Sequence, residues 1–240
     1  MVKKLIKNIL KTFDYRLIKI SKNKNSFDIL LNLIEKKKIQ LTFDIGANQG
    51  QFSLNLRDVG YKYEIFSFEP LSKEHEMLKQ KAIKDKYWKI YSRCAVGNFD
   101  GNIDLNVSSY SPSSSILNFS TNHEKAKPEA KTIGVENSPI YKLDTIIKEL
   151  NLQNKNFFMK IDTQGYEKFV IEGTNENLKN CKIIYCEVSL KEVYKNQTLW
   201  FEIINLLKSK GFDITSIENG FEDKLNNNLL QADIIFVKND

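Results

Sequence analysis

The chain has 240 residues, with 36 Lys or Arg against 30 Asp or Glu and hence a formal net charge of +6. This length is enough for one large α/β domain with a full core. No apolar run approaches the roughly 20 residues that a membrane-spanning helix needs, and no signal peptide with a cleavage site is recognisable. The three cysteines (Cys94, Cys181 and Cys186) show no C-x-x-C spacing. We therefore expect a cytoplasmic protein with free thiols and no structural zinc.

The positive charge is concentrated at the N-terminus. Residues 1–40 contain eleven Lys or Arg and three Asp or Glu, so the other 200 residues sum to −2. Within this part, residues 2–20 place apolar side chains at helical spacing with lysines between them, and Ser26 is a candidate cap for a second helix. We expect residues 1–40 to form a basic helical arm ahead of a domain at 41–240. Residues 1–24 would contact an anionic membrane face or a partner enzyme, or else pack on the domain or on a second subunit of a homodimer.

From residue 41 onward, short apolar runs alternate with helical patterns. The pattern predicts strands at 41–45, 64–69, 87–96, 103–107, 157–162, 182–188, 212–217 and 231–237. It predicts helices at 26–37, 51–59, 72–84, 143–150, 166–173 and 198–209. This is an α/β arrangement of about seven sheet strands interleaved with helices, whose last two strands can pair as a hairpin. Residues 108–139, rich in Ser, Asn, Lys and Pro, are expected to form a long substrate-facing insertion.

The turn after the first predicted strand carries the clearest chemical signal. Its glycines, Gly46 and Gly50, follow a G-x-x-x-G spacing rather than the G-x-G-x-x-G of dinucleotide sites, and Asp44 precedes the first of them. An acid here would repel a pyrophosphate but suits a cationic ligand such as S-adenosylmethionine (SAM). The two glycines, which have no Cβ, would let the methionine moiety and the ribose approach the backbone.

Acids also follow other predicted parallel strands. Glu69, Asp162 and Glu187 join Asp44 at or next to the C-terminal ends of strands, where ligands bind in open α/β sheets. Glu69 is placed to accept both ribose hydroxyls. Four carboxylates along one edge would repel one another unless a cation or a hydroxyl-rich ligand lay among them. Each acid alone could instead cap a helix, and for Asp162 this alternative is as strong as a catalytic role.

Together these motifs resemble the FkbM family of class I SAM-dependent methyltransferases. The resemblance covers about residues 40–190 and is carried by Phe43–Asn48 with Gly50, Phe52 and Ser53, by Phe68-Glu69-Pro70, Ala95-Val96-Gly97 and Leu143-Asp144-Thr145, and by Lys160-Ile161-Asp162 with Gly165 and Glu167. It implies a Rossmann-like fold with a seven-stranded, mostly parallel sheet whose last strand is reversed. It also implies methyl transfer to a hydroxyl of a sugar, a glycan or a polyketide-type molecule.

The resemblance further implies which residues form the site. The SAM-binding set would be Asp44, Gly46, Ala47, Asn48, Gly50, Phe52, Ser53, Glu69, Pro70, Cys94, Ala95, Asp162 and Gln164. Asp162 and Gln164 would face the methyl group and the acceptor. Ser113, Ser114 and Ser115 would close over the acceptor side, where Glu187 is also assigned, although a flexible polar loop is an equal interpretation of the serines.

A sugar hydroxyl is a poor nucleophile, so a base or a metal is expected to assist. Asp162 is the first candidate base. His123 is the second because imidazole titrates near neutrality, although a solvated loop histidine is its more ordinary interpretation. His75 is expected at the surface. Asp162 and Glu187 supply two ligands for Mg²⁺ but no third is recognisable, so no metal site is assigned and metal dependence is left open.

The leading hypothesis is an O-methyltransferase for a small molecule or glycan, with no nucleic-acid substrate because the domain itself lacks a basic face. One alternative is a catalytically silent SAM-binding scaffold that docks through its basic arm. A second is an NAD-dependent oxidoreductase or epimerase, which the missing third glycine and the acid before the first glycine disfavour.

Overall fold

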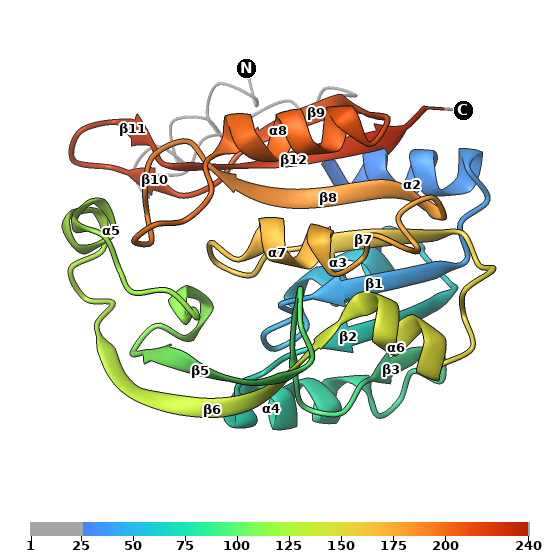
Figure 1. The fold of residues 1–240 in the computed structure, drawn as a ribbon, viewed down its shortest axis with the longest axis horizontal. Coiled ribbons are helices and arrows are strands. Elements are labelled where there is room, and N and C mark those ends of the chain that lie inside the picture. Colours follow the sequence, from blue (N-terminus) through green and yellow to red (C-terminus); the bar gives the residue numbers. More distant parts are fainter. Residues whose placement is uncertain (1–25, 240) are drawn as a thin grey trace, which may run out of the picture.

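The computed structural model describes residues 26–239. The amphipathic helix expected at 2–20, and the docking role expected for residues 1–24, lie outside the described residues. The central element is a seven-stranded sheet in the order β3-β2-β1-β7-β8-β12-β9, with helices on both faces (Figure 1). Its strands are β1 (Leu41–Ile45), β2 (Glu64–Phe68), β3 (Trp88–Ile90), β7 (Phe157–Ile161), β8 (Cys181–Ser189), β9 (Phe212–Asn219) and β12 (Gln231–Lys238).

The strand directions confirm the expected fold. Pairing is parallel from β3 through β8, whereas β12 is antiparallel to both β8 and β9. This is the Rossmann-like class I methyltransferase sheet with a reversed last strand. The chain runs outward from β1 to β2 and β3, and then returns to the other side of β1 as β7. The ends of β1 and β7 therefore form the topological switch point, where such sheets bind ligands.

Helices cover both faces of the sheet (Figure 1). Helices α2 (Ser26–Lys36), α3 (Gln51–Asp58) and α4 (Ser72–Ala82) pack on one face, and α6 (Leu143–Glu149), α7 (Glu167–Glu172) and α8 (Trp200–Ser209) pack on the other. Their fully buried side chains include Leu30, Leu56 and Leu78 on the first face and Ile146 and Val170 on the second. Residues 26–39, assigned from the sequence to the arm, thus contribute to the domain core through α2.

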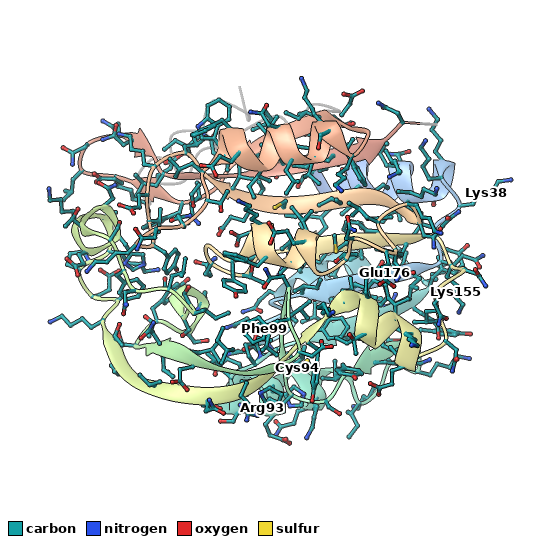
Figure 2. The ribbon with its side chains drawn as sticks, in the orientation of Figure 1. Lys38, Arg93, Cys94, Phe99, Lys155 and Glu176 are labelled. Carbon is teal, nitrogen blue, oxygen red and sulfur yellow. The ribbon has the colours of Figure 1, made fainter. Side chains whose placement is uncertain are left out.

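The strand predicted at 87–96 is wrong as a single element. It is divided into β3 and β4 (Ala95–Gly97), and β4 belongs to a separate three-stranded sheet with β5 (Gly101–Ser108) and β6 (Thr132–Lys142). The break has a local cause: the Arg93 guanidinium donates to the Pro70 carbonyl at 2.7 Å and pairs with Glu136 of β6 at 2.8 Å. These bonds direct the chain away from the main sheet. Arg93 and Cys94 lie on the side of the molecule where β5 and β6 run (Figure 2).

The insertion expected as a long loop has regular structure over much of its length. Residues 108–139 include a 3₁₀ turn, η1 (Ser111–Ser113), helix α5 (Thr121–Ala126) and the first part of β6. Ser120 caps α5 by accepting a hydrogen bond from the Asn122 amide, at 3.2 Å. A short hairpin, β10 (Glu222–Asp223) and β11 (Asn228–Leu229), lies beside α5. The insertion covers the side of the sheet at which β1 ends (Figure 1).

His75 is not a surface residue as expected. It lies on α4 and is 8% exposed, and its Nε2 is 2.8 Å from the carbonyl oxygen of Tyr91. The helical pattern of 72–84 is weakly amphipathic, so the sequence alone could not orient this side chain.

A buried lysine joins the ends of β1 and β7. Lys160 is in register with Asp44, and their side chains are 4% and 0% exposed. The Lys160 Nζ is 3.4 Å from Asp44 Oδ1 and donates to the carbonyl oxygens of Ile45 and Gly46 at 3.3 Å and 2.7 Å. Burial alone would lower the pKa of this amine, but Asp162 and Asp44 outweigh it and raise the pKa above its usual value.

The Lys160–Asp44 pair generates a stability prediction. Lys160→Met leaves Asp44 buried without its cation, so we expect the free energy of unfolding to fall by about 3–5 kcal/mol. Asp44→Asn removes the uncompensated charge. The free energy of unfolding of the Lys160→Met/Asp44→Asn double variant should therefore fall by less than the sum of the two single decreases, with a difference of about 1–3 kcal/mol. Urea denaturation followed by circular dichroism measures both quantities.

The control for this cycle is Lys79→Met, which breaks the exposed pair between Lys79 and Glu76. Exposed pairs contribute about 0–1 kcal/mol, so its loss should be small. Strictly additive losses for the Lys160 and Asp44 variants would contradict the account of the buried pair.

Candidate active site

A cavity lies at the switch point of the sheet. The turn after β1 and the segment after β2 form one side of it, and the end of β7 and the inserted segment form the other. Of the residues assigned to the site from the sequence, those that line this first cavity are Gly46, Asn48, Glu69, Pro70, Cys94, Ala95, Ser114, Ser115, Asp162 and Gln164. The fold therefore brings together residues that are more than 100 positions apart in the chain.

Glu69 is held in a fixed orientation by backbone amides. Its Oε2 accepts from the Asn48 amide at 2.8 Å and its Oε1 from the Leu71 amide at 2.9 Å. Each carboxylate oxygen keeps a further lone pair for another donor. The side chain is 4% exposed, and burial raises the pKa of its carboxyl to about 7 despite these two bonds. Glu69 is thus a preoriented acceptor at the wall of the cavity.

A chain of hydrogen bonds connects Asp162, which follows β7, with Glu187 near the end of β8. The Gln164 side-chain amide donates to Asp162 Oδ1 at 2.6 Å and to Glu187 Oε2 at 2.7 Å. Its own Oε1 accepts from the Tyr194 hydroxyl at 2.6 Å. Gln231 donates to the same Glu187 oxygen at 2.7 Å. Burial first, and then the neighbouring Asp162, raises the pKa of Glu187 well above its usual value.

The serine-rich segment is fastened over the first cavity rather than loose. Ser115 donates from Oγ to the Gln164 carbonyl at 2.7 Å, and Ser111 accepts from the Asn48 side-chain amide at 2.7 Å. The Ser113 carbonyl lies 3.2 Å from the Tyr194 hydroxyl. The strap formed by residues 111–115 therefore touches both the glycine turn and the Gln164 network.

A second cavity adjoins the first. Pro112, Asp162 and Gln164 line both, so these residues separate the two spaces. Of the other residues assigned to the site, Ser113, His123 and Glu187 line the second cavity. The interpretation of His123 as a solvated loop histidine is wrong: it lies on α5 and is 1% exposed.

Five assigned residues line neither cavity, namely Asp44, Ala47, Gly50, Phe52 and Ser53. Asp44 is engaged by Lys160 and accepts from the Ser53 hydroxyl at 2.6 Å. Ala47 and Phe52 pack in the core beneath α3. Gly50 has φ +85°, and a Cβ there would lie 2.7 Å from the Trp88 ring. These residues shape the turn, while the backbone of Gly46 and the amide of Asn48 face the site.

The structure explains why position 46 must be glycine, apart from any contact with a ligand. Its φ is +72°, and a Cβ at this position would lie 1.9 Å from the Asp162 carbonyl oxygen. Any side chain would therefore push β1 and β7 apart at the switch point.

Several lining residues were not assigned from the sequence. In the first cavity these are chiefly apolar (Ile45, Phe68, Leu71, Val96, Leu105 and Ile116), and in the second they include Tyr110, Lys127, Phe221 and Gln231. The apolar residues carry no chemical signal that separates them from core residues. Lys160 was quoted within a motif, but nothing in its strand pattern marks it as a buried cation.

No group of three or more His, Cys, Asp or Glu suited to hold a metal ion is found within residues 26–239. In the same part of the chain, no helix has the length and apolar character to cross a membrane.

The chain is similar to known methyltransferases. The profile of the methyltransferase FkbM domain matches residues 44–214. The chain is 25% identical to the 2-O-methyltransferase NoeI of Sinorhizobium fredii over 186 residues, which cover 75% of each protein. Among solved structures, it overlays on an rRNA methylase from Streptococcus thermophilus with a TM-score of 0.49 at 8% identity, covering 92% of this chain and 100% of that one. It overlays on TehB from Haemophilus influenzae with a TM-score of 0.48 at 9% identity, covering 96% of this chain and 66% of that one.

The family profile spans the glycine turn, Glu69, the insertion and the Asp162 strand end, which are the parts that build the two cavities. This chain belongs to the FkbM methyltransferase family.

Proposed function

We propose that this protein transfers a methyl group from SAM to a hydroxyl of a sugar, a glycan or a related small molecule. One observation carries the proposal: the first cavity, which contains a preoriented carboxylate, meets a second cavity at Asp162 and Gln164. Two adjoining spaces suit a reaction in which a donor and an acceptor must be held in line.

The residues of the first cavity fit SAM. Among its 19 lining residues there is no Lys, Arg or His, so nothing there would neutralise a pyrophosphate. Glu69 offers oxygens to the ribose hydroxyls, and Phe68, Leu71 and Val96 offer an apolar surface to adenine. Asp162, with its side chain 37% exposed, offers negative charge to a cationic group. These features favour a phosphate-free, positively charged cofactor over a dinucleotide.

When bound, SAM supplies a methyl group activated by a sulfonium. The protein then has to hold an acceptor oxygen in line and accept its proton. Asp162 is the group in this proposal that accepts the proton, because it lines both cavities. Lys160, 3.6 Å from Asp162 Oδ2, and Gln164 hold the carboxylate in place.

Charge also supports a small-molecule or glycan acceptor. The residues beyond 40 carry a net charge of −2, which disfavours a polyanionic nucleic acid. A small molecule or a glycan fits this charge better.

Asp162→Asn tests the assignment of the base. The amide cannot accept the proton, so we expect kcat to fall by about 10²–10⁴-fold while the affinity for S-adenosylhomocysteine changes by less than about fivefold. The assay measures methyl transfer from radiolabelled SAM to a panel of aryl glycosides. Asp213→Asn, at an exposed site on β9, is the matched control. Unchanged turnover in Asp162→Asn would place the base elsewhere. Cofactor binding without turnover by the wild type would favour the silent-scaffold alternative.

Glu69→Gln tests the ribose contact. Gln presents only one acceptor oxygen to two backbone amides, so we expect the dissociation constant of S-adenosylhomocysteine to rise by about 10–100-fold. The pH dependence has a definite sign: hydroxyl donors favour the ionised carboxylate, whose pKa in the free protein is about 7. Wild-type affinity should therefore rise from about pH 6 to about pH 8 and then level off.

Calorimetric titration across this pH range measures both effects of Glu69. Glu76→Gln, at an exposed position on the same helix as His75, is the control and should behave as the wild type. Affinity that is independent of pH in the wild type, or undiminished in Glu69→Gln, would contradict a ribose-binding role.

A further inference from the structure

His123 is buried with a ring nitrogen that lacks a hydrogen-bond partner. Within residues 26–239, nothing bonds to its Nδ1, and the residue is 1% exposed. The ring stacks on Phe119 with centroids 3.8 Å apart and planes 6° apart, and Tyr194 and Phe221 flank it at 5.8 Å. Buried polar atoms are nearly always paired, because an unpaired one loses its hydration without compensation. The unpaired nitrogen of His123 is therefore a candidate to form a hydrogen bond with a ligand.

The helix that carries His123 is firmly fastened. The Ser120 amide donates to the Val193 carbonyl at 2.9 Å, and the Ser120 hydroxyl donates to the Glu192 carbonyl at 2.6 Å. The Asn122 side chain donates to the same Glu192 carbonyl at 2.8 Å. These bonds tie α5 to the segment that follows β8. The orientation of the imidazole is therefore set by the fold.

His123 and the Asp162 network line the same cavity, the second one. The cavity is lined on the sheet side by Asp162, Gln164 and Glu187 and on the insertion side by His123. The aromatic rings of Tyr110 and Phe221 also line it, and such faces pack against the C–H face of a carbohydrate ring. A molecule that filled this space would touch acidic and amide groups at one end and the imidazole at the other.

The chemistry of the imidazole suits binding rather than proton transfer. Burial, and then the nearby Lys127, lowers the pKa of His123 to about 4. The ring is therefore neutral at pH 7, with one nitrogen as donor and the other as acceptor. A group that holds protons so weakly is a poor base for a hydroxyl but a good hydrogen-bond partner for one.

We infer that the second cavity is the acceptor site and that His123 positions the acceptor by a hydrogen bond to a hydroxyl other than the one that is methylated. This inference rests on the proposed function. It assigns the acceptor at least two hydroxyls, one at Asp162 and one across the cavity at His123. His123 is thus a positioning residue, and the catalytic role stays with Asp162.

The chain has two histidines, so a direct spectroscopic test is available. The full chain labelled with ¹⁵N-histidine is saturated with S-adenosylhomocysteine and titrated with p-nitrophenyl glycosides of neutral hexoses and 6-deoxyhexoses. We expect the ring nitrogens of His123 to shift on addition of at least one glycoside, while those of His75, bonded to Tyr91, stay in place. Absence of a His123 shift with every glycoside overturns the inference.

Kinetics separate positioning from catalysis. His123→Phe keeps a stacked ring on Phe119 but removes both nitrogens, so we expect the KM for the reactive glycoside to rise about tenfold or more while kcat changes by less than about threefold. His123→Gln keeps a hydrogen-bonding group, so its KM should lie between those of the wild type and His123→Phe. The pH profile of turnover should be the same in the wild type and in His123→Phe.

Turnover that drops by about two orders of magnitude in His123→Phe, with an unchanged KM and an altered pH profile, would make His123 the base and overturn the inference. Loss of S-adenosylhomocysteine binding in His123→Phe would also overturn it, because that would show a structural effect on the first cavity. Failure of the wild type to bind S-adenosylhomocysteine is seen by calorimetry before any glycoside is added. That result overturns the proposed function itself and is distinct from the other outcomes.

Discussion

The buried ammonium of Lys160 is the interaction on which the arrangement of the site depends. An isolated charge in a protein core is very unfavourable, so it must be paired and hydrogen-bonded. Lys160 meets this requirement with Asp44, two carbonyl oxygens of the glycine turn, and Asp162. The glycine turn and the Asp162 strand end are thereby held against each other. The absence of a Cβ on Gly46 allows the same contact sterically.

This constraint gives the acids of the sheet edge different roles. Asp44 is fully buried and pairs with Lys160, so it stabilises the glycine turn and lines neither cavity. Asp162 keeps part of its surface exposed at the junction of the two cavities. Glu187, which lines the second cavity, accepts hydrogen bonds from Gln164 and Gln231, and its pKa is raised. These three acids look equivalent in the sequence, and their contacts and their burial distinguish them in the structure.

Much of this fold follows from short-range patterns, and the exceptions have physical reasons. The central strands and the glycine turn are predictable because apolar runs, strand-end acids and glycines mark them locally. The division of β3 from β4 depends on Arg93 reaching Pro70 and Glu136, which no periodicity reveals. The burial of His123 depends on rings from three separate segments, Phe119, Tyr194 and Phe221. A buried lysine such as Lys160 is rare, so a strand pattern gives no reason to expect one.

The role of the insertion in the site could not be predicted from the sequence either. Its composition indicates a polar loop, and its role comes from long-range bonds to Gln164, Asn48 and the segment after β8. The first two bonds hold the segment that carries Pro112, which lines both cavities together with Asp162 and Gln164.

We propose that the first cavity holds a phosphate-free, sulfonium-bearing cofactor and not a dinucleotide. Isothermal titration of the full chain with S-adenosylhomocysteine and, separately, with NAD⁺ tests it most directly. We expect one-to-one binding of S-adenosylhomocysteine and no heat of binding with NAD⁺. Saturable binding of NAD⁺, or no binding of S-adenosylhomocysteine, would contradict it.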